Sequence, residues 1–241
     1  MLVFFALAFL GSCGGDVRRF ETPDVSGPPS VRLDVVDDHA EQFDTDVPER
    51  PPGSEEEQAA AAYILGTLQQ NGYFARLEAV PVADLVRSTN VIAEPSGADV
   101  PQAMVVVPYG TVEGDDSNGE ALGLFLELAR AVNVAEPQHA VHFTAVGAAE
   151  AQLGARRLAR LLLDEERDPF IVELVSGVQG FVAEGDRSEE LAELAGEAAS
   201  GGSLPERTDV FGAAGFEHVV VGGDVEVVGD VLVRFLSSFQ Q

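Results

Sequence analysis

Apolar and polar positions along this chain follow two periods, one typical of helices and one typical of strands. The segment between Ser54 and Gly72 has the helical period. Ser54 and Glu57 fit a capping box at its start, and Gly72 fits a helix stop. Residues 73–82 alternate like a half-buried strand, and residues 103–109 form a continuous apolar run typical of a strand inside a sheet. The pattern predicts a helix followed by strands.

Helical and strand patterns continue to alternate along the chain. The predicted strands cover residues 73–82, 90–94, 103–109, 140–146, 170–175 and 218–223. The predicted helices after the first cover residues 120–132, 150–166, 188–199 and a segment that ends near Phe239. Such alternation predicts an α/β fold, a three-layer sandwich in which helices flank a mostly parallel mixed sheet. We expect residues 33–241 to form this single domain.

The residues before this domain have a different composition. Residues 2–10 form an apolar run that is too short to span a bilayer and has the length of a signal-peptide core. Leu10-Gly11-Ser12-Cys13 follows and resembles a bacterial lipobox, although no Lys or Arg precedes the apolar run. We therefore expect residues 1–13 to be a lipoprotein-type signal peptide. An ordinary signal peptide and a buried terminal segment are the alternatives.

Residues 14–32 are rich in Gly, Pro, Asp and Ser, and this composition predicts a flexible tether. Acylation of Cys13 would join the tether to a membrane. This interpretation places the domain outside the cytoplasm, lipid-anchored to the bacterial cell envelope.

The charge balance is strongly acidic. The chain has 41 acidic residues against 14 basic ones, a net charge of −27, and every basic residue is an arginine. Such a surface repels phosphate backbones and anionic headgroups, so we expect no nucleic-acid partner and no membrane adsorption through a basic patch. Adaptation to high salt and an ordinary acidic surface both fit this composition.

Segments between Glu49 and Gly222 resemble, in the correct order, those of the zinc-dependent exopeptidases, the family of secreted bacterial leucyl aminopeptidases and glutamate carboxypeptidase II. "ERPPGSEEEQ" resembles the R-x-x-G-S-x-x-E segment, "STNVIAE" the S-x-N-V-I-A strand, and "VHFTAVGAAEAQLGARR" the strand and turn with a Glu-Glu pair. The resemblance implies two zinc ions held by five side chains. It also implies a separate glutamate that acts as general base on a metal-bound water.

Most positions of this metal set carry other residues here. The H-x-D motif falls on Pro108 and Gly110, and the general base falls on Ala149. The aspartate at the end of a later strand falls on Leu174, and the last histidine is missing in a deletion after Asp209. Zinc requires imidazole, thiolate or carboxylate ligands, and the side chains of Pro108, Gly110 and Leu174 offer none of these.

Two positions of the metal set keep a carboxylate. Glu150 matches the second glutamate of the Glu-Glu pair, which is a ligand. The bridging acid falls on Asp115 or Asp116, although a count without gaps from the following helix gives Ser117. One or two carboxylates do not hold catalytic zinc, so we expect no bound cofactor and interpret these acids as vestigial. Capping and helix-dipole complementation are their alternative roles.

The four histidines could rebuild a metal site only if they came together. His139 and His142 differ by three positions, which places them on opposite faces of a strand. His39 precedes the first predicted helix and His218 opens a strand. We expect capping or surface roles for all four. A basic patch on the helix after Glu150 is expected to be ion-paired: Arg156, Arg157 and Arg160.

These observations favour a lipid-anchored, aminopeptidase-like domain that is not catalytic. Such a pseudo-peptidase would bind a peptide or an envelope protein, or serve as part of the envelope structure. Any ligand would lie at the carboxyl ends of the parallel strands. The alternative is an active zinc-dependent exopeptidase with a rearranged site built from Asp115 or Asp116, Glu150 and Asp209.

Overall fold

A computed structural model of the protein describes residues 27–83, 85–97, 100–111, 118–137, 139–199 and 202–239. The predicted signal peptide with Cys13 lies outside these residues, as do Asp115, Asp116 and Ser117. The backbone of Glu150 is described but its side chain is not.

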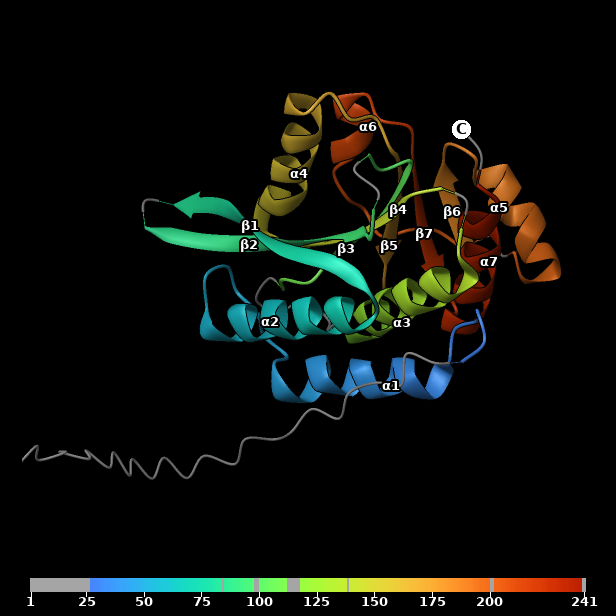
Figure 1. The fold of residues 1–241 in the computed structure, drawn as a ribbon, viewed down its shortest axis with the longest axis horizontal. Coiled ribbons are helices and arrows are strands. Elements are labelled where there is room, and N and C mark those ends of the chain that lie inside the picture. Colours follow the sequence, from blue (N-terminus) through green and yellow to red (C-terminus); the bar gives the residue numbers. More distant parts are fainter. Residues whose placement is uncertain are drawn as a thin grey trace, which may run out of the picture.

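A mixed sheet of seven strands crosses the described part of the molecule (Figure 1). The strands are β1 (Tyr73–Ala83), β2 (Val86–Pro95), β3 (Ala103–Pro108), β4 (Val141–Val146), β5 (Phe170–Val175), β6 (Phe181–Gly185) and β7 (His218–Gly223). They lie in the order β1-β2-β4-β3-β5-β7-β6. The central strands β4, β3, β5 and β7 are parallel to one another. The remaining strands, β1, β2 and β6, are antiparallel to their neighbours.

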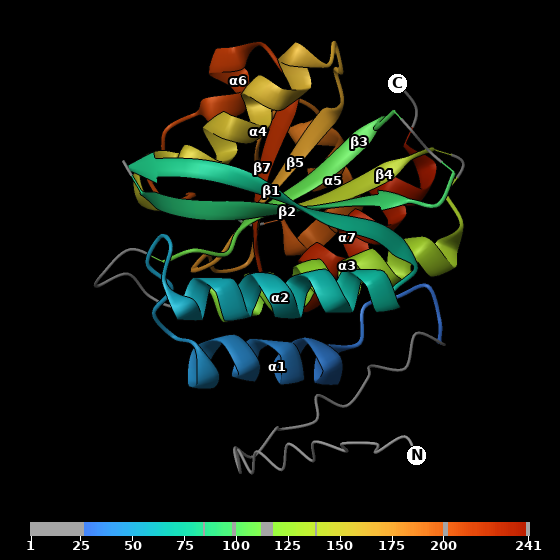
Figure 2. The same ribbon diagram turned by 60° about the vertical axis from the view of Figure 1, so that its left-hand side comes forward.

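Helices cover both faces of this sheet (Figures 1 and 2). One face carries α4 (Leu153–Asp164) and α6 (Val210–Ala214). The other carries α2 (Glu55–Gln70), α3 (Gly119–Ala135) and α7 (Val225–Ser238), with α5 (Ser188–Ala195) packed on α7 and β6. Short helical turns cover Gln42–Asp46, Glu150–Gln152 and Gly196–Ala198. The predicted α/β sandwich on a mixed sheet is confirmed.

A further helix, α1 (Leu33–Glu41), packs on α3 and adds an outer layer that the sequence did not predict. Its own apolar signal is weak, because only Val36 and His39 are buried. Glycines in α3 allow the close approach. A Cβ at Gly123 would lie 2.4 Å from the carbonyl oxygen of Val36, and a Cβ at Gly119 would lie 2.8 Å from that of Ala40. The helix therefore depends on its partner, which its local sequence does not reveal.

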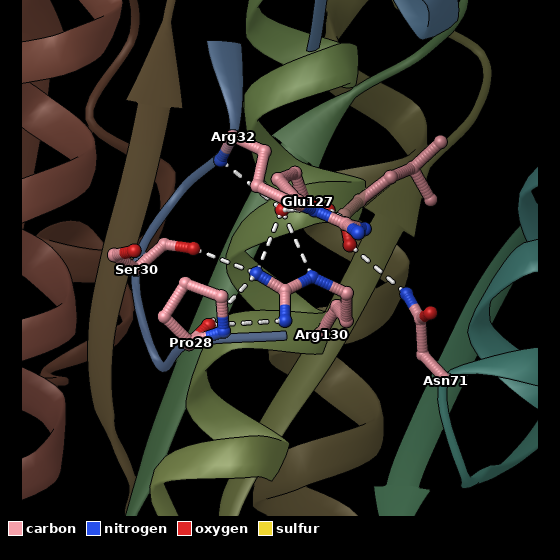
Figure 3. A network of polar contacts seen from close by, with 7 residues as sticks. Pro28, Ser30, Arg32, Asn71, Glu127 and Arg130 are labelled. Carbon is pink, nitrogen blue, oxygen red and sulfur yellow. Dashed lines mark hydrogen bonds and ion pairs between the residues drawn. The ribbon is translucent and has the colours of Figure 1, made fainter. Parts of the chain in front are cut away.

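The chain just before α1 is fastened to α3 (Figure 3). Arg130 donates hydrogen bonds to the carbonyl oxygens of Pro28 (3.2 Å) and Ser30 (2.6 Å). Arg32 donates through Nε to Glu127 Oε1 over 2.8 Å, and Arg130 pairs with the same carboxylate over 2.8 Å. The Glu127 and Arg130 side chains are each 1% exposed. The last residues of the segment expected to be a tether are thus hydrogen-bonded along α3.

Apolar side chains form two cores, one on each face of the sheet. The larger lies between the sheet and the layer of α2, α3 and α7, and the smaller lies between the sheet and the pair α4 and α6. No helix in the described part of the chain is long and apolar enough to cross a membrane.

Candidate binding cleft at the strand ends

A cleft of about 300 Å³ opens at the carboxyl ends of β3, β4 and β5. It lies on the α4 face of the sheet, because α4 contributes Ala155 to its wall. Ligands of α/β proteins bind at this end of a parallel sheet, as the sequence led us to expect. Its apolar lining residues are Val106, Pro108, Val146, Ala149, Ala155, Val175 and Pro205. Its polar lining side chains are Gln152, Glu173, Ser176 and Arg207.

The turn between β4 and α4 forms one wall of the cleft and has an unusual backbone. Ala148, Ala151 and Gln152 have φ angles of 48°, 52° and 54°. A non-glycine residue in this left-handed region costs about 1–2 kcal/mol. Ala149, which stands where the family has its general base, lines the cleft with a methyl group. The strained backbone thus flanks the position at which the resemblance implies a general base.

A buried carboxylate holds this turn in place. Glu57 Oε1 accepts hydrogen bonds from the Ala148 amide (2.9 Å) and from Ser88 Oγ (2.6 Å), and its Oε2 accepts from the Gly53 amide (2.6 Å). The predicted cap is confirmed on the other side, since the Glu57 amide donates to Ser54 Oγ over 3.0 Å. Glu57 thus joins the start of α2 to β2 and to the cleft wall.

The side chain of Asn90 and close backbone packing also hold this turn in place. Asn90 accepts through Oδ1 from the Gly147 amide (3.2 Å) and donates through Nδ2 to the Gly154 carbonyl (2.9 Å). A Cβ at Gly154 would lie 2.1 Å from the Gly147 carbonyl oxygen. Asn90, Gly147 and Gly154, which belong to segments that carry the family resemblance, therefore hold the backbone of this turn in place.

A buried guanidinium ties the end of β3 to its surroundings. Arg50 is 0% exposed and donates to the carbonyl oxygens of Tyr109 (2.6 Å), Phe43 (3.0 Å) and Val47 (2.5 Å), and to Asn118 Oδ1. Burial lowers its pKa to about 10, so the group stays charged at neutral pH. Oxygens of the backbone and of Asn118 solvate this charge and join β3 to the start of α3.

The described residues do not fit the zinc that the resemblance implies. Pro108, Gly110 and Ala149 offer no ligating side-chain atom. A Cβ at Gly110 would lie 3.1 Å from the Ala149 amide nitrogen, which is tighter than an ordinary contact. Within the described ranges, no group of three or more His, Cys, Asp or Glu residues could hold a metal ion.

The structure does not test the roles of the acidic residues that match the metal set. Asp115 and Asp116 lie outside the described residues, and the side chain of Glu150 is not described. Their vestigial role stays a prediction. Asp209, the further acid of the rearranged site, caps α6 by accepting from the Gly212 amide over 2.7 Å. It also lies 3.2 Å from His218 Nε2.

β5 contributes a carboxylate to the cleft that sequence matching missed. Spacing from Gly177 selected Leu174, but Leu174 points into the larger core on the opposite face of the sheet. Because side chains alternate along a strand, Glu173 faces the cleft and lines it. A single acid inside the apolar run "FIVELV" was the signal in the sequence.

Glu173 is paired with an arginine from a distant loop. Its residue is 5% exposed, and burial raises its pKa while the nearby Arg207 guanidinium opposes this shift. Arg207 Nη2 donates to Glu173 Oε2. The carboxylate at the floor of the cleft is therefore neutralised by a guanidinium of the same chain.

The expected surface or capping roles are wrong for two of the histidines. His142 on β4 and His39 on α1 are buried, and burial lowers the pKa of each to about 4. His39 Nδ1 lies 2.5 Å from the Tyr63 hydroxyl. Neither ring nitrogen of His142 has a hydrogen-bond partner among the described residues. His139 precedes β4, and its Nδ1 lies 2.9 Å from Gln102 Oε1.

The predicted ion-paired face of α4 is confirmed in two of its arginines. Arg157 pairs with Glu78 on β1 over 2.5 Å, and Arg160 pairs with Asp164 over 3.9 Å. Arg156 donates to the Ala151 carbonyl over 3.0 Å instead. Arg157 attaches α4 to the edge strand β1, and Arg156 attaches it to the turn Glu150–Gln152 that precedes it.

No family model and no curated protein matches the sequence. Solved structures do match its fold. A leucine aminopeptidase precursor from Bacteroides thetaiotaomicron has a TM-score of 0.71 and 16% identity, over 89% of this chain and 99% of that one. A glutaminyl cyclase from the same species, bound to N-acetylhistamine, has a TM-score of 0.70 and 15% identity, over 89% and 100%. A putative Zn-dependent exopeptidase from Bacteroides vulgatus has a TM-score of 0.69 and 16% identity, over 90% and 100%.

These similarities cover nearly the whole length of each protein compared. The chain therefore has the fold shared by Zn-dependent exopeptidases, leucine aminopeptidases and glutaminyl cyclases. This confirms the fold that the sequence resemblance implied.

Proposed function

We propose that this protein is a pseudo-peptidase, a non-catalytic domain with an aminopeptidase-like fold that binds a peptide segment in its cleft. The observation that supports this proposal is the chemistry of the cleft wall. Where hydrolysis needs metal ligands and a general base, the wall presents Pro108 and Ala149. The carboxylate of Glu173 at its floor is neutralised by Arg207.

Hydrolysis of a peptide bond requires an activated water and a stabilised oxyanion. A metal ion and a carboxylate base supply both in this fold, and loss of a base or ligand removes the rate enhancement it gives. Binding requires less. An apolar wall gains about 25 cal/mol for each Å² of apolar ligand surface that it removes from water. The cleft has a volume of about 300 Å³ and a largely apolar wall, which supports binding.

Zinc content and hydrolysis test the non-catalytic part of the proposal. We expect the purified mature domain to contain no stoichiometric zinc and to hydrolyse chromogenic aminoacyl substrates no faster than background. Stoichiometric zinc that is lost in the Glu150→Ala variant would overturn the proposal, because Glu150 is the ligand that the active alternative requires. Chelator-sensitive hydrolysis would overturn it as well.

Peptide binding tests the remaining part. A fluorescent peptide library should contain members that bind the wild-type domain and fail to bind Ala149→Trp. The indole at position 149 would fill the cleft from its rim, where the side chain is only half-buried. Equal binding to both proteins would show that the cleft is not the peptide site.

We further propose that the domain is held outside the cytoplasm, on the bacterial cell envelope, by a lipid on Cys13. The lipobox-like sequence Leu10-Gly11-Ser12-Cys13 supports this. Membrane fractionation should find the wild-type protein with the envelope and the Cys13→Ser variant in the soluble fraction. Release of both proteins into the soluble fraction would contradict the anchor.

A further inference from the structure

The floor of the cleft holds a carboxylate that needs a paired cation when it is ionised. Glu173 lies in β5 between buried neighbours, and it is 5% exposed. An ionised carboxylate at such a position is strongly destabilising unless it is paired. Glu173 is also the one acidic side chain among the described residues that line the cleft. Any group that enters the cleft therefore meets either this carboxylate or the cation bound to it.

The cation that neutralises Glu173 comes from a segment with few other attachments. Residues 202–209, called the strap below, connect the chain after α5 to the start of α6 and form no helix or strand. Residues of the strap are exposed except Leu204 and Arg207, which are half-buried. Asp209 fixes its end as the cap of α6. Among the described residues, Arg207 makes no hydrogen bond or ion pair except to Glu173.

We propose that Glu173 is the recognition group of the cleft and that its ligand carries a guanidinium or ammonium group on an apolar stem. Arg207 then holds the place of that cation while the cleft is empty, and leaves with the strap when the ligand enters. This inference rests on the proposed function of the cleft and names the chemistry of its ligand.

Exchange of one cation for another is the step that makes such binding feasible. The carboxylate stays paired before and after the exchange, so the cost of an unpaired buried charge is not incurred in either state. The stem of the ligand would lie against Val106, Val146 and Val175, which line the same cleft. A volume of about 300 Å³ is at the small end of ligand pockets and suits a single side chain. The net charge of −27 raises the local concentration of cations and disfavours anions.

Calorimetric titration with Nα-acetyl-arginine amide tests this ligand chemistry. Nα-acetyl-citrulline amide, which has nearly the same shape without the charge, is the control probe. We expect Arg207→Met to bind the arginine probe at least tenfold more tightly than the wild type, because the competing guanidinium is gone. We expect Glu173→Gln to lose that binding, and we expect no preference for the citrulline probe in any variant. Equal affinity of both probes for Arg207→Met would overturn the inference.

Two further measurements keep the test decisive if the single variants fold poorly. The double variant Glu173→Gln/Arg207→Met removes both charges, so it should fold and should not prefer the arginine probe. In the wild type, hydrogen exchange of the strap should increase when saturating arginine probe is added, and the Glu173→Gln protein should show no change. A strap whose exchange is the same with and without the probe would contradict displacement of Arg207.

The outcomes separate this inference from the proposed function. If peptides bind the wild type and not Ala149→Trp, while Arg207→Met gains no affinity for the arginine probe, the cleft is a peptide site and the role of Glu173 is refuted. If stoichiometric zinc or chelator-sensitive hydrolysis is found, the non-catalytic function itself is refuted.

Discussion

Single residues around the cleft carry an unusual backbone that their contacts hold in place. Ala148, Ala151 and Gln152 hold left-handed backbone angles within five residues, beside Ala149, where the sequence resemblance implies a general base. Strained backbone of this kind persists when the surroundings over-determine it, as the contacts of Glu57 with Ala148 do here. The side chain that this turn places in the cleft wall is the methyl group of Ala149. Relief of the backbone strain should therefore raise the stability of the folded protein.

Ala151→Gly tests this interpretation of the turn. Glycine adopts a φ of 52° without the steric cost that alanine has, so the free energy of unfolding should rise by about 0.5–1 kcal/mol. Ala62→Gly on the exposed side of α2 is the matched control, and it should lower the same quantity by about 1 kcal/mol. Urea unfolding measures both. Destabilisation by Ala151→Gly would show that the alanine makes a contact that outweighs the strain.

The buried histidines make stability depend on pH. His39 and His142 have a pKa of about 4 in the folded protein, and unfolding restores the ordinary value near 6.5. The unfolded chain therefore binds more protons between these values, and the free energy of unfolding falls as the pH is lowered from 6.5 towards 4. Each histidine contributes on the order of 3 kcal/mol over this range. Glu173 opposes them, because its raised pKa adds stability at low pH that is lost as the pH rises.

His142→Leu should weaken this pH dependence. Because neither ring nitrogen of His142 has a partner among the described residues, an apolar side chain of similar size removes a desolvation cost and loses no described hydrogen bond. We expect a higher melting temperature at pH 5 and a smaller difference between pH 5 and pH 7. An unchanged difference would assign the effect to other groups.

Elements with a strong local pattern could be predicted from the sequence, and elements that depend on a partner could not. The helix after Ser54 has its own cap and the strand before Pro108 its own apolar run, so both were predicted. α1 has two buried residues and lies against glycines of α3, and short elements such as β6 and α6 have little pattern of their own. The site follows the same rule. Alignment with the family motif selected Leu174 as the position of the metal ligand. Only the pleat of β5 in the structure shows that Glu173, and not Leu174, faces the cleft.

The dependence of α1 on its contact with α3 can be tested by a substitution at the point of closest approach. Gly123→Ala would place a Cβ 2.4 Å from the Val36 carbonyl oxygen, so the two helices must separate. We expect the free energy of unfolding to fall by about 1–3 kcal/mol. Gly66→Ala in α2 is the control. A Cβ there meets nothing within 4 Å, and the higher helix propensity of alanine should raise stability by up to about 1 kcal/mol. Equal effects of both changes would mean that α1 does not need the close approach.

The whole molecule carries a charge that opposes its own compaction. With 41 acidic and 14 basic residues, like-charge repulsion is stronger in the folded state than in the expanded one. The Debye length falls from about 30 Å at 0.01 M salt to about 3 Å at 1 M, so screening of this repulsion becomes stronger. We expect the melting temperature to rise between these salt concentrations when NaCl is used. A melting temperature that is independent of salt would show that the acids are already balanced by local contacts, and would remove the case for adaptation to high salt.

The fastening of the chain to α3 determines how the molecule would bear a mechanical load. A pull on the chain ahead of residue 27 would reach the body first through Arg130 and its bonds to Pro28 and Ser30. The load would then pass along α3, which lies on one face of the sheet, while the cleft and α4 lie on the other. Tension on an anchored protein would therefore strain α3 and its partners before it distorted the walls around Glu173.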